Sequence, residues 1–242
     1  MSMTASLNPI KSASETSRRT AIPLAWLALL QAGLFLVPMI VLGQAIGWPA
    51  SLRLPAAEAL PLIAREALAV QIGYWAYLLT SLAFIPFALA LRRFAIARGA
   101  QGLVTDTMAG LGMAVAVFKM LGIVRWLVAM PTLATFYMAN PDPAQRAVIE
   151  ITYVVLNGYA GAVGELLGVQ LASGLWLILG GLVLGRLGMR WIGVSAGVIG
   201  ALFVATCLRT MVPAAGILQS GAVPLALVWF VAFAVVLWRQ RG

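Results

Sequence analysis

The chain has 242 residues, of which 62% are hydrophobic and 10% are charged, and its mean hydropathy is +1.00. A soluble domain has about a quarter of its residues charged, so this composition excludes an ordinary soluble protein and predicts an integral membrane protein. The net charge of +9 does not point to nucleic acid, because most of the arginines lie in short links between apolar runs. Such a distribution is typical of the cytoplasmic loops of membrane proteins.

The sequence contains no histidine, and Cys207 is its single cysteine. These counts exclude an internal disulfide, a bis-histidine haem site and Ser-His catalysis, and they exclude nearly all zinc sites. Carboxylates are too few for a di-metal site, and the glycine pairs lie inside apolar runs rather than in a phosphate-binding loop. We therefore expect no cofactor, no metal and no catalytic residues, and an enzyme is the less favoured class.

Six apolar runs are long enough to cross a membrane, since about 20 helical residues span about 30 Å of hydrocarbon. These runs follow a polar tail of residues 1–21. The first run is too long for the apolar region of a signal peptide, so we expect this first span to be retained. Helices are the physical expectation, because irregular backbone in lipid leaves polar groups unsatisfied. The sequence predicts an all-α polytopic bundle forming one domain of residues 22–242. Its expected spans are about 22–47, 67–91, 107–133, 161–185, 191–212 and 222–238.

The basic residues of the short loops predict the orientation. With the N-terminus inside, ten basic residues fall in the inner segments, whereas the outer loops hold Arg53, Arg65 and Arg146 beside acidic residues. Both termini are therefore expected in the cytoplasm. The inner basic residues are Lys11, Arg18, Arg19, Arg92, Arg93, Arg98, Arg186, Arg190, Arg239 and Arg241.

Helix signals outside the spans give three further expectations. Residues 55–66 could form a short interfacial helix. Asp142 and Pro143 are suited to the cap and first position of a helix, which covers 144–159 and either continues into the fourth span or breaks at Gly158 or Gly161. Asp106 is expected to cap the third span at its cytoplasmic end.

Charges inside the spans mark the expected working site, because charged side chains are costly in a membrane and are therefore paired or used. Lys119 falls near mid-depth of the third span, and Arg125 lies about 9 Å further out. Glu165 of the fourth span and Arg209 of the fifth fall in the outer third. These four residues therefore share a region, with Lys119 lowest. The step of six residues from Lys119 to Arg125 puts those two on different helix faces.

Three interpretations of this group stay open. Glu165 could simply pair with an arginine to hold the bundle together, or the excess positive charge could attract an anion, or the group could form part of a proton path. Polar neighbours complete the expected ligand-binding set, namely Asn157 together with Tyr74 and Gln71 of the second span. Asn157, Gly161, Glu165, Gly168 and Ala172 recur at α-helical spacing, and such a stripe of small residues is more often a packing face.

The segment from residue 174 to 200, GLWLILGGLVLGRLGMRWIGVSAGVIG, resembles a hairpin of a known family. It is similar to bacterial multi-span membrane proteins of the domain-of-unknown-function 4386 family, in which a Trp-containing span ends in a basic turn and a Gly-rich span follows. Overall length, span number and the long outer loop before the fourth span are also similar. Met189 stands where that family has a proline. The resemblance implies a small bacterial inner-membrane protein and no particular catalytic residues.

We therefore expect a non-enzymatic, multi-pass protein of the bacterial inner (cytoplasmic) membrane. Its outward-facing cationic pocket would bind a lipid headgroup or small anion through Lys119, Arg125, Arg209 and Glu165. The expected partners are membrane lipid and an anionic ligand, not nucleic acid, with a homo-oligomer or a membrane-protein partner also open. The alternatives are a small proton-coupled transporter, and an accessory subunit that docks a membrane partner through glycine-rich helix faces.

Overall fold

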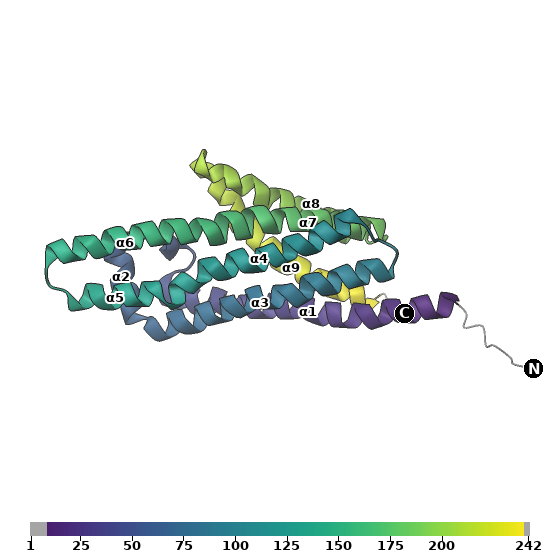
Figure 1. The fold of residues 1–242 in the computed structure, drawn as a ribbon, viewed down its shortest axis with the longest axis horizontal. Coiled ribbons are helices and arrows are strands. Elements are labelled where there is room, and N and C mark those ends of the chain that lie inside the picture. Colours follow the sequence, from purple (N-terminus) through teal and green to yellow (C-terminus); the bar gives the residue numbers. More distant parts are fainter. Residues whose placement is uncertain (1–8, 240–242) are drawn as a thin grey trace, which may run out of the picture. The chain divides into compact units, whose positions relative to one another are not determined.

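The computed structural model describes residues 9–239, and every regular element in this range is helical, which confirms the all-α prediction. Figure 1 shows the helices in chain order. They are α1 (Pro9–Ile46), η1 (Ala50–Arg53), α2 (Ala56–Arg65), α3 (Ala67–Ala97), α4 (Leu103–Leu127), α5 (Ala129–Ala139), α6 (Pro143–Ala162), η2 (Val163–Ala172), α7 (Ser173–Arg186), α8 (Arg190–Ala205), η3 (Thr206–Thr210), η4 (Pro213–Gly216) and α9 (Ile217–Arg239).

Six helices of the described range are long and apolar enough to cross a membrane, one for each predicted span. Two of them are longer than expected, because Leu103–Ala139 has 37 residues and Pro143–Arg186 has 44. At 1.5 Å per residue the second is about 66 Å long, roughly twice the hydrocarbon thickness. The helix predicted over 144–159 therefore runs on into the fourth span. The cytoplasmic location of the termini stays a prediction.

The helix starts follow local capping chemistry, with one correction. The carboxylate of Asp142 accepts a hydrogen bond from the Ala144 N–H at 3.0 Å, and Pro143 is the first helical residue, as predicted. Asp106 is not the cap of α4, which already begins at Leu103. Its carboxylate instead lies in the first turn and accepts a hydrogen bond from Arg92 Nε at 2.8 Å. An acidic residue in the first turn is favourable there because of the helix dipole.

The last two spans differ from their predicted bounds at the outer end. The helix α8 ends at Ala205 and continues as the 3-10 segment η3, so the regular part of the fifth span is shorter than 191–212. The helix α9 begins at Ile217 rather than at 222, and Pro224 lies inside it. A proline removes a single backbone hydrogen bond, which membrane helices tolerate.

The described chain forms two compact units. The first comprises the residues up to Leu30, Ile85–Met113 and the residues from Ser173 onward, and the second comprises Gln31–Phe84 and Ala114–Ala172. In the first unit α7 and α8 form a close hairpin, since a Cβ added at Gly181 would lie 2.4 Å from the Gly193 carbonyl oxygen.

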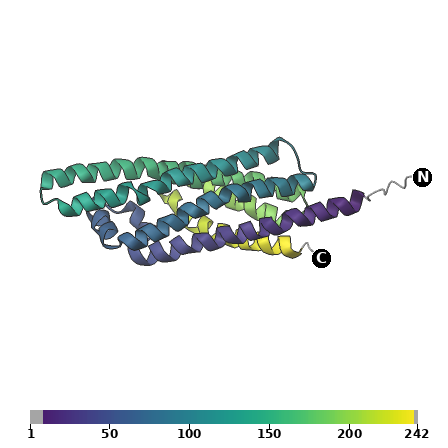
Figure 2. The same ribbon diagram turned by 60° about the horizontal axis from the view of Figure 1, so that its bottom comes forward.

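The second unit has its hydrophobic core where α2 packs on α5 and α6 (Figure 2). The core includes the stacked rings of Tyr74 and Trp126, whose centroids are 4.8 Å apart with an interplanar angle of 7°. All the predicted site residues except Arg209 belong to this unit. The buried residues of the hydrophobic core are Leu42, Ile46, Ala56, Ala59, Leu60, Ile63, Val70, Tyr74, Ile123, Trp126, Met130, Leu133, Ala134, Tyr137 and Tyr153.

The third span is interrupted at Val128, which separates α4 from α5 with φ −122° and ψ −65°. The cause is Pro131, which has no N–H to donate to the carbonyl of Leu127 four residues earlier. Gln71 of α3 replaces that donor, because its Nε2 lies 3.2 Å from the Leu127 oxygen. The Gln71 amide therefore stabilises the break, a structural role that the sequence left open beside ligand binding.

Replacing Gln71 by leucine is expected to destabilise the protein by about 1–3 kcal/mol, the cost of leaving a buried carbonyl without a donor. Replacing Pro131 by alanine restores the backbone N–H, so the same Gln71→Leu change should cost close to nothing in the Pro131→Ala background. Thermal unfolding of the four proteins of this double-mutant cycle measures the coupling. An equal cost of Gln71→Leu in both backgrounds would contradict this role.

Candidate functional site: an intramembrane charge cluster

Lys119 is half-buried on α4, and its ammonium lies against aromatic ring faces. Its Nζ is 5.2 Å from the ring centroid of Tyr77 and 5.9 Å from that of Phe35. These two rings pack edge-to-face with centroids 5.3 Å apart. Cation–π contacts of this kind are worth about 0.5–2 kcal/mol each, more where the site is dry. The rings therefore offset part of the cost of placing this charge in the membrane.

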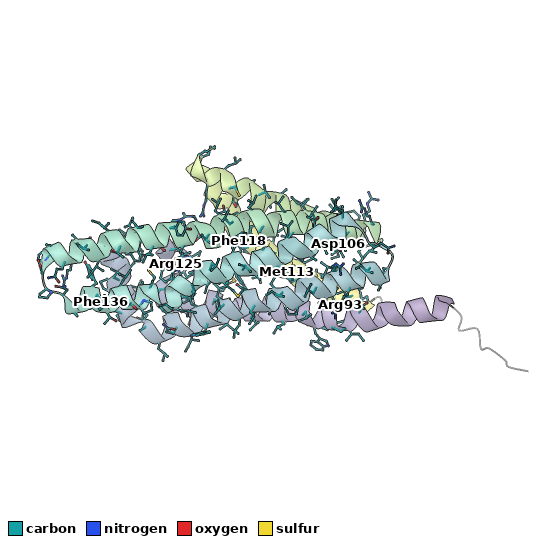
Figure 3. The ribbon with its side chains drawn as sticks, viewed as in Figure 1. Arg93, Asp106, Met113, Phe118, Arg125 and Phe136 are labelled. Atoms are coloured by element: carbon teal, nitrogen blue, oxygen red, sulfur yellow. The ribbon has the colours of Figure 1, made fainter. Side chains whose placement is uncertain are left out.

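Arg125 lies near the end of α4, about two turns beyond Phe118 (Figure 3). Although it carries a guanidinium, the residue is only 8% exposed. Its Nε donates to Asn157 Oδ1 at 3.2 Å, and its Nη1 donates to the Gly122 carbonyl at 2.6 Å. Two hydrogen bonds from different nitrogens fix the plane of the guanidinium. Asn157, one of the predicted ligand-binding residues, is thus a partner of Arg125.

Two tyrosine hydroxyls accompany this guanidinium. Tyr74 and Tyr153 are each 1% exposed, and the hydroxyl of each is buried without a hydrogen-bond partner among the described residues. Both interact electrostatically with Arg125. A buried hydroxyl without a partner costs about 1–3 kcal/mol, and such groups in native structures are few. The two hydroxyls therefore have hydrogen-bonding capacity that no described residue satisfies.

The segment that carries Glu165 is π-helical, since η2 spans ten residues with π-type hydrogen bonding. A π-helix is rare in proteins, and where one occurs it is often at a functional site. Gly164, which the expected stripe lacks, faces α4 together with Gly161 and Gly168. Gly164 and Gly168 are buried, whereas Glu165 is half-buried and interacts electrostatically with Arg125 and Tyr77. That Glu165 belongs to a ligand-binding group around Arg125 stays a prediction.

Glycines let α4 and the long helix α6–η2 approach closely. A Cβ added at Gly122 would lie 2.4 Å from the Cα of Gly164, and one added at Gly168 would lie 3.1 Å from Lys119 Cγ. A Cβ at Gly161 would lie 3.3 Å from Arg125 Nη2, so the missing side chain makes room for the guanidinium. These glycines therefore serve contacts between helices of the same chain.

Arg209 lies in η3, within the first unit. Its inclusion in the same site stays a prediction. Within the second unit the cluster consists of Lys119, Arg125, Asn157 and Glu165 together with three tyrosines, Tyr74, Tyr77 and Tyr153. The charge within this cluster is two cations to one carboxylate, so it retains the positive excess inferred from the sequence.

Sequence reasoning missed several members of the cluster. Tyr153 shares one face of α6 with Asn157 and Gly161 at intervals of four residues, a signal that could have found it. Asn157 also donates a hydrogen bond from its side-chain Nδ2 to the backbone carbonyl of Leu52. A sequence motif of side chains cannot reveal a backbone acceptor of this kind. Among residues 9–239, no three His, Cys, Asp or Glu side chains lie together as they would to hold a metal ion.

A scan against protein-family models finds no match, and searches of the curated proteins and of the solved structures find no similar chain. The resemblance to the domain-of-unknown-function 4386 family therefore stays a prediction. Function has to be inferred from the chemistry of the cluster alone.

Proposed function

We propose that this chain is a non-enzymatic membrane protein that binds an oxyanion at Arg125. The ligand would be the phosphate or carboxylate group of a lipid headgroup or of a small free anion. The observation that carries the proposal is the juxtaposition of a buried guanidinium with two buried tyrosine hydroxyls, neither of which is hydrogen-bonded by any described residue. A guanidinium can only donate hydrogen bonds, and a tyrosine hydroxyl can donate one. This set of groups suits a ligand rich in acceptor oxygens.

The charges of the cluster support an anion rather than a neutral ligand. Lys119, on the same helix as Arg125, adds a second positive charge, and Glu165 balances one of the two. In surroundings poor in water, a charge-assisted hydrogen bond to an anion is about twice as strong as a neutral one. In the orientation that the loop arginines predict, the cluster lies toward the outer side of a bacterial inner membrane, so the proposed ligand would arrive from the outer leaflet or the periplasm.

Removing both orphan hydroxyls in a Tyr74→Phe, Tyr153→Phe double variant tests the proposal. Without ligand, the variant should be at least as stable as the wild type, because it no longer buries two unpaired polar groups. Its affinity for the oxyanion should fall about 30-fold, the equivalent of two neutral hydrogen bonds. Thermal unfolding and ligand binding of the purified protein measure the two effects. Tyr159→Phe is the matched control, because Tyr159 lies on α6 but is 75% exposed.

Two probes distinguish the two sources of the oxyanion. Nanodiscs containing phosphatidylglycerol are compared with phosphatidylcholine nanodiscs, and inorganic phosphate is titrated separately. Mass spectrometry of the purified protein identifies the lipid that stays bound. Retention of an acidic lipid by the wild type, lost in the double variant, supports a headgroup; binding of phosphate alone supports a free anion. If the wild type binds neither probe, or if the double variant binds like the wild type, the proposal is wrong.

A further inference from the structure

A short segment between α1 and α2 contacts the surroundings of both intramembrane cations. We call residues 47–54 the strap. It leaves α1 at Gly47, whose φ of +67° is the left-handed region that favours glycine. It then forms the single turn η1 and ends at Leu54 in extended conformation. Trp48, Leu52 and Leu54 pack against the hydrophobic core of the second unit.

The first part of the strap lies on the Lys119 side of the cluster. The Trp48 ring contacts Phe35 and Tyr77 edge-to-face, with centroid distances of 6.3 and 6.1 Å. These are the same two rings whose faces lie near Lys119 Nζ. Trp48 therefore helps to hold the rings in the orientation that offsets the lysine charge.

The second part of the strap is tied to Arg125 through one side chain. The Asn157 amide donates from Nδ2 to the Leu52 carbonyl at 3.1 Å and accepts at Oδ1 from Arg125 Nε at 3.2 Å. The direction of this amide is determined by its partners, because a guanidinium can only donate and a carbonyl can only accept. An asparagine thus meets both requirements at once, whereas an aspartate has no N–H for Leu52.

We propose that Asn157 is the positioning residue of the oxyanion site and that the closed strap sets its orientation. This inference rests on the proposed function and adds how the site is kept in its binding geometry. With Nε held by Asn157 and Nη1 by Gly122, the guanidinium has one orientation to offer a ligand. When the strap opens, Asn157 loses its second partner, and Arg125 loses that orientation. Bound oxyanion should in turn stabilise the closed strap, since the coupling of two equilibria is reciprocal.

Hydrogen–deuterium exchange of residues 47–54, measured with and without phosphatidylglycerol nanodiscs or phosphate, tests the inference alongside binding affinity. In the wild type the ligand should slow exchange of the strap. Asn157→Ala should weaken binding about tenfold and abolish this ligand-dependent protection. Asn157→Asp should weaken binding more, because its carboxylate neutralises the guanidinium that the oxyanion needs. Thr152→Ala is the control, since this exchange removes only a hydroxyl bonded to Val148 within α6.

Trp48→Leu provides a second variant that touches neither Arg125 nor Asn157. The substitution removes the ring contacts at the N-terminal end of the strap. It should therefore also weaken ligand binding and reduce the ligand-dependent protection of residues 47–54 from hydrogen–deuterium exchange. If the wild type binds and the Asn157 and Trp48 variants bind equally well, the inference is wrong while the proposed function stands. If ligand leaves strap exchange unchanged in the wild type, the inference is likewise wrong. If the wild type binds neither probe, both proposals fail.

Discussion

Replacing Gly122 by leucine is expected to prevent the second unit from folding. An added Cβ at this position would lie 2.4 Å from Gly164 Cα and 3.1 Å from the Ala160 carbonyl oxygen. Both contacts are with the backbone of the facing helix, so no side-chain rotation can relieve them. Overpacking usually costs about 1–3 kcal/mol where side chains can adjust, and the cost is larger where two helices must separate. Even Gly122→Ala should lower the melting temperature by about 5 °C or more.

Gly158 offers a matched control for this prediction. It lies on α6, and a Cβ added there meets nothing within 4 Å. Gly158→Ala should leave the melting temperature unchanged or raise it slightly, since alanine favours helix over glycine by up to about 1 kcal/mol. Circular dichroism and thermal unfolding in detergent compare the variants. Equal tolerance of alanine at positions 122 and 158 would contradict the close contact between α4 and η2.

Replacing Arg125 by glutamine is expected to abolish oxyanion binding, with a loss of affinity of about 100-fold or more. The variant removes the cation and its charge-assisted hydrogen bonds, each worth about 1.5–3 kcal/mol. The variant should also have a modestly lower thermal stability, because Asn157 Oδ1 and the Gly122 carbonyl lose their hydrogen-bond donor. Titration of phosphatidylglycerol nanodiscs and of inorganic phosphate measures the affinity, and thermal unfolding measures the stability separately.

Two further variants separate charge from geometry at this position. Arg125→Lys retains the positive charge but cannot reproduce the planar fork of donors, so it should recover only a small part of the affinity. Arg65→Gln removes an arginine whose side chain is 70% exposed and should bind like the wild type. Full binding by Arg125→Gln would exclude the guanidinium as the ligand-binding group, whatever its effect on stability.

The cluster also shows how a membrane protein holds charged side chains against uncharged groups. Lys119 lies over ring faces, and Arg125 is held by an amide and a backbone carbonyl. Neither contact neutralises the positive charge. Ring faces and neutral acceptors stabilise a cation without removing its charge.

The sequence by itself determined the all-α class of the protein and the approximate positions of its six apolar helices. Composition and run length depend on the partition of side chains between water and lipid, so each of the six predicted spans corresponds to a helix. Local chemistry was equally informative at Asp142, where the cap and the following proline specify a helix start. It failed at Asp106, because an acidic residue is favourable both as a cap and one turn inside the helix.

Only the tertiary structure decided which groups meet. Arg125 and Asn157 are 32 residues apart, Gln71 and Leu127 are 56 apart, and Asn157 and Leu52 are 105 apart. These pairings depend on how each helix is rotated about its axis, and glycine contacts and the π-helical turn of η2 change that rotation without altering hydrophobicity. The sequence could therefore name Lys119, Arg125 and Glu165 as costly charges, but their partners and the unpaired hydroxyls of Tyr74 and Tyr153 follow from packing between helices.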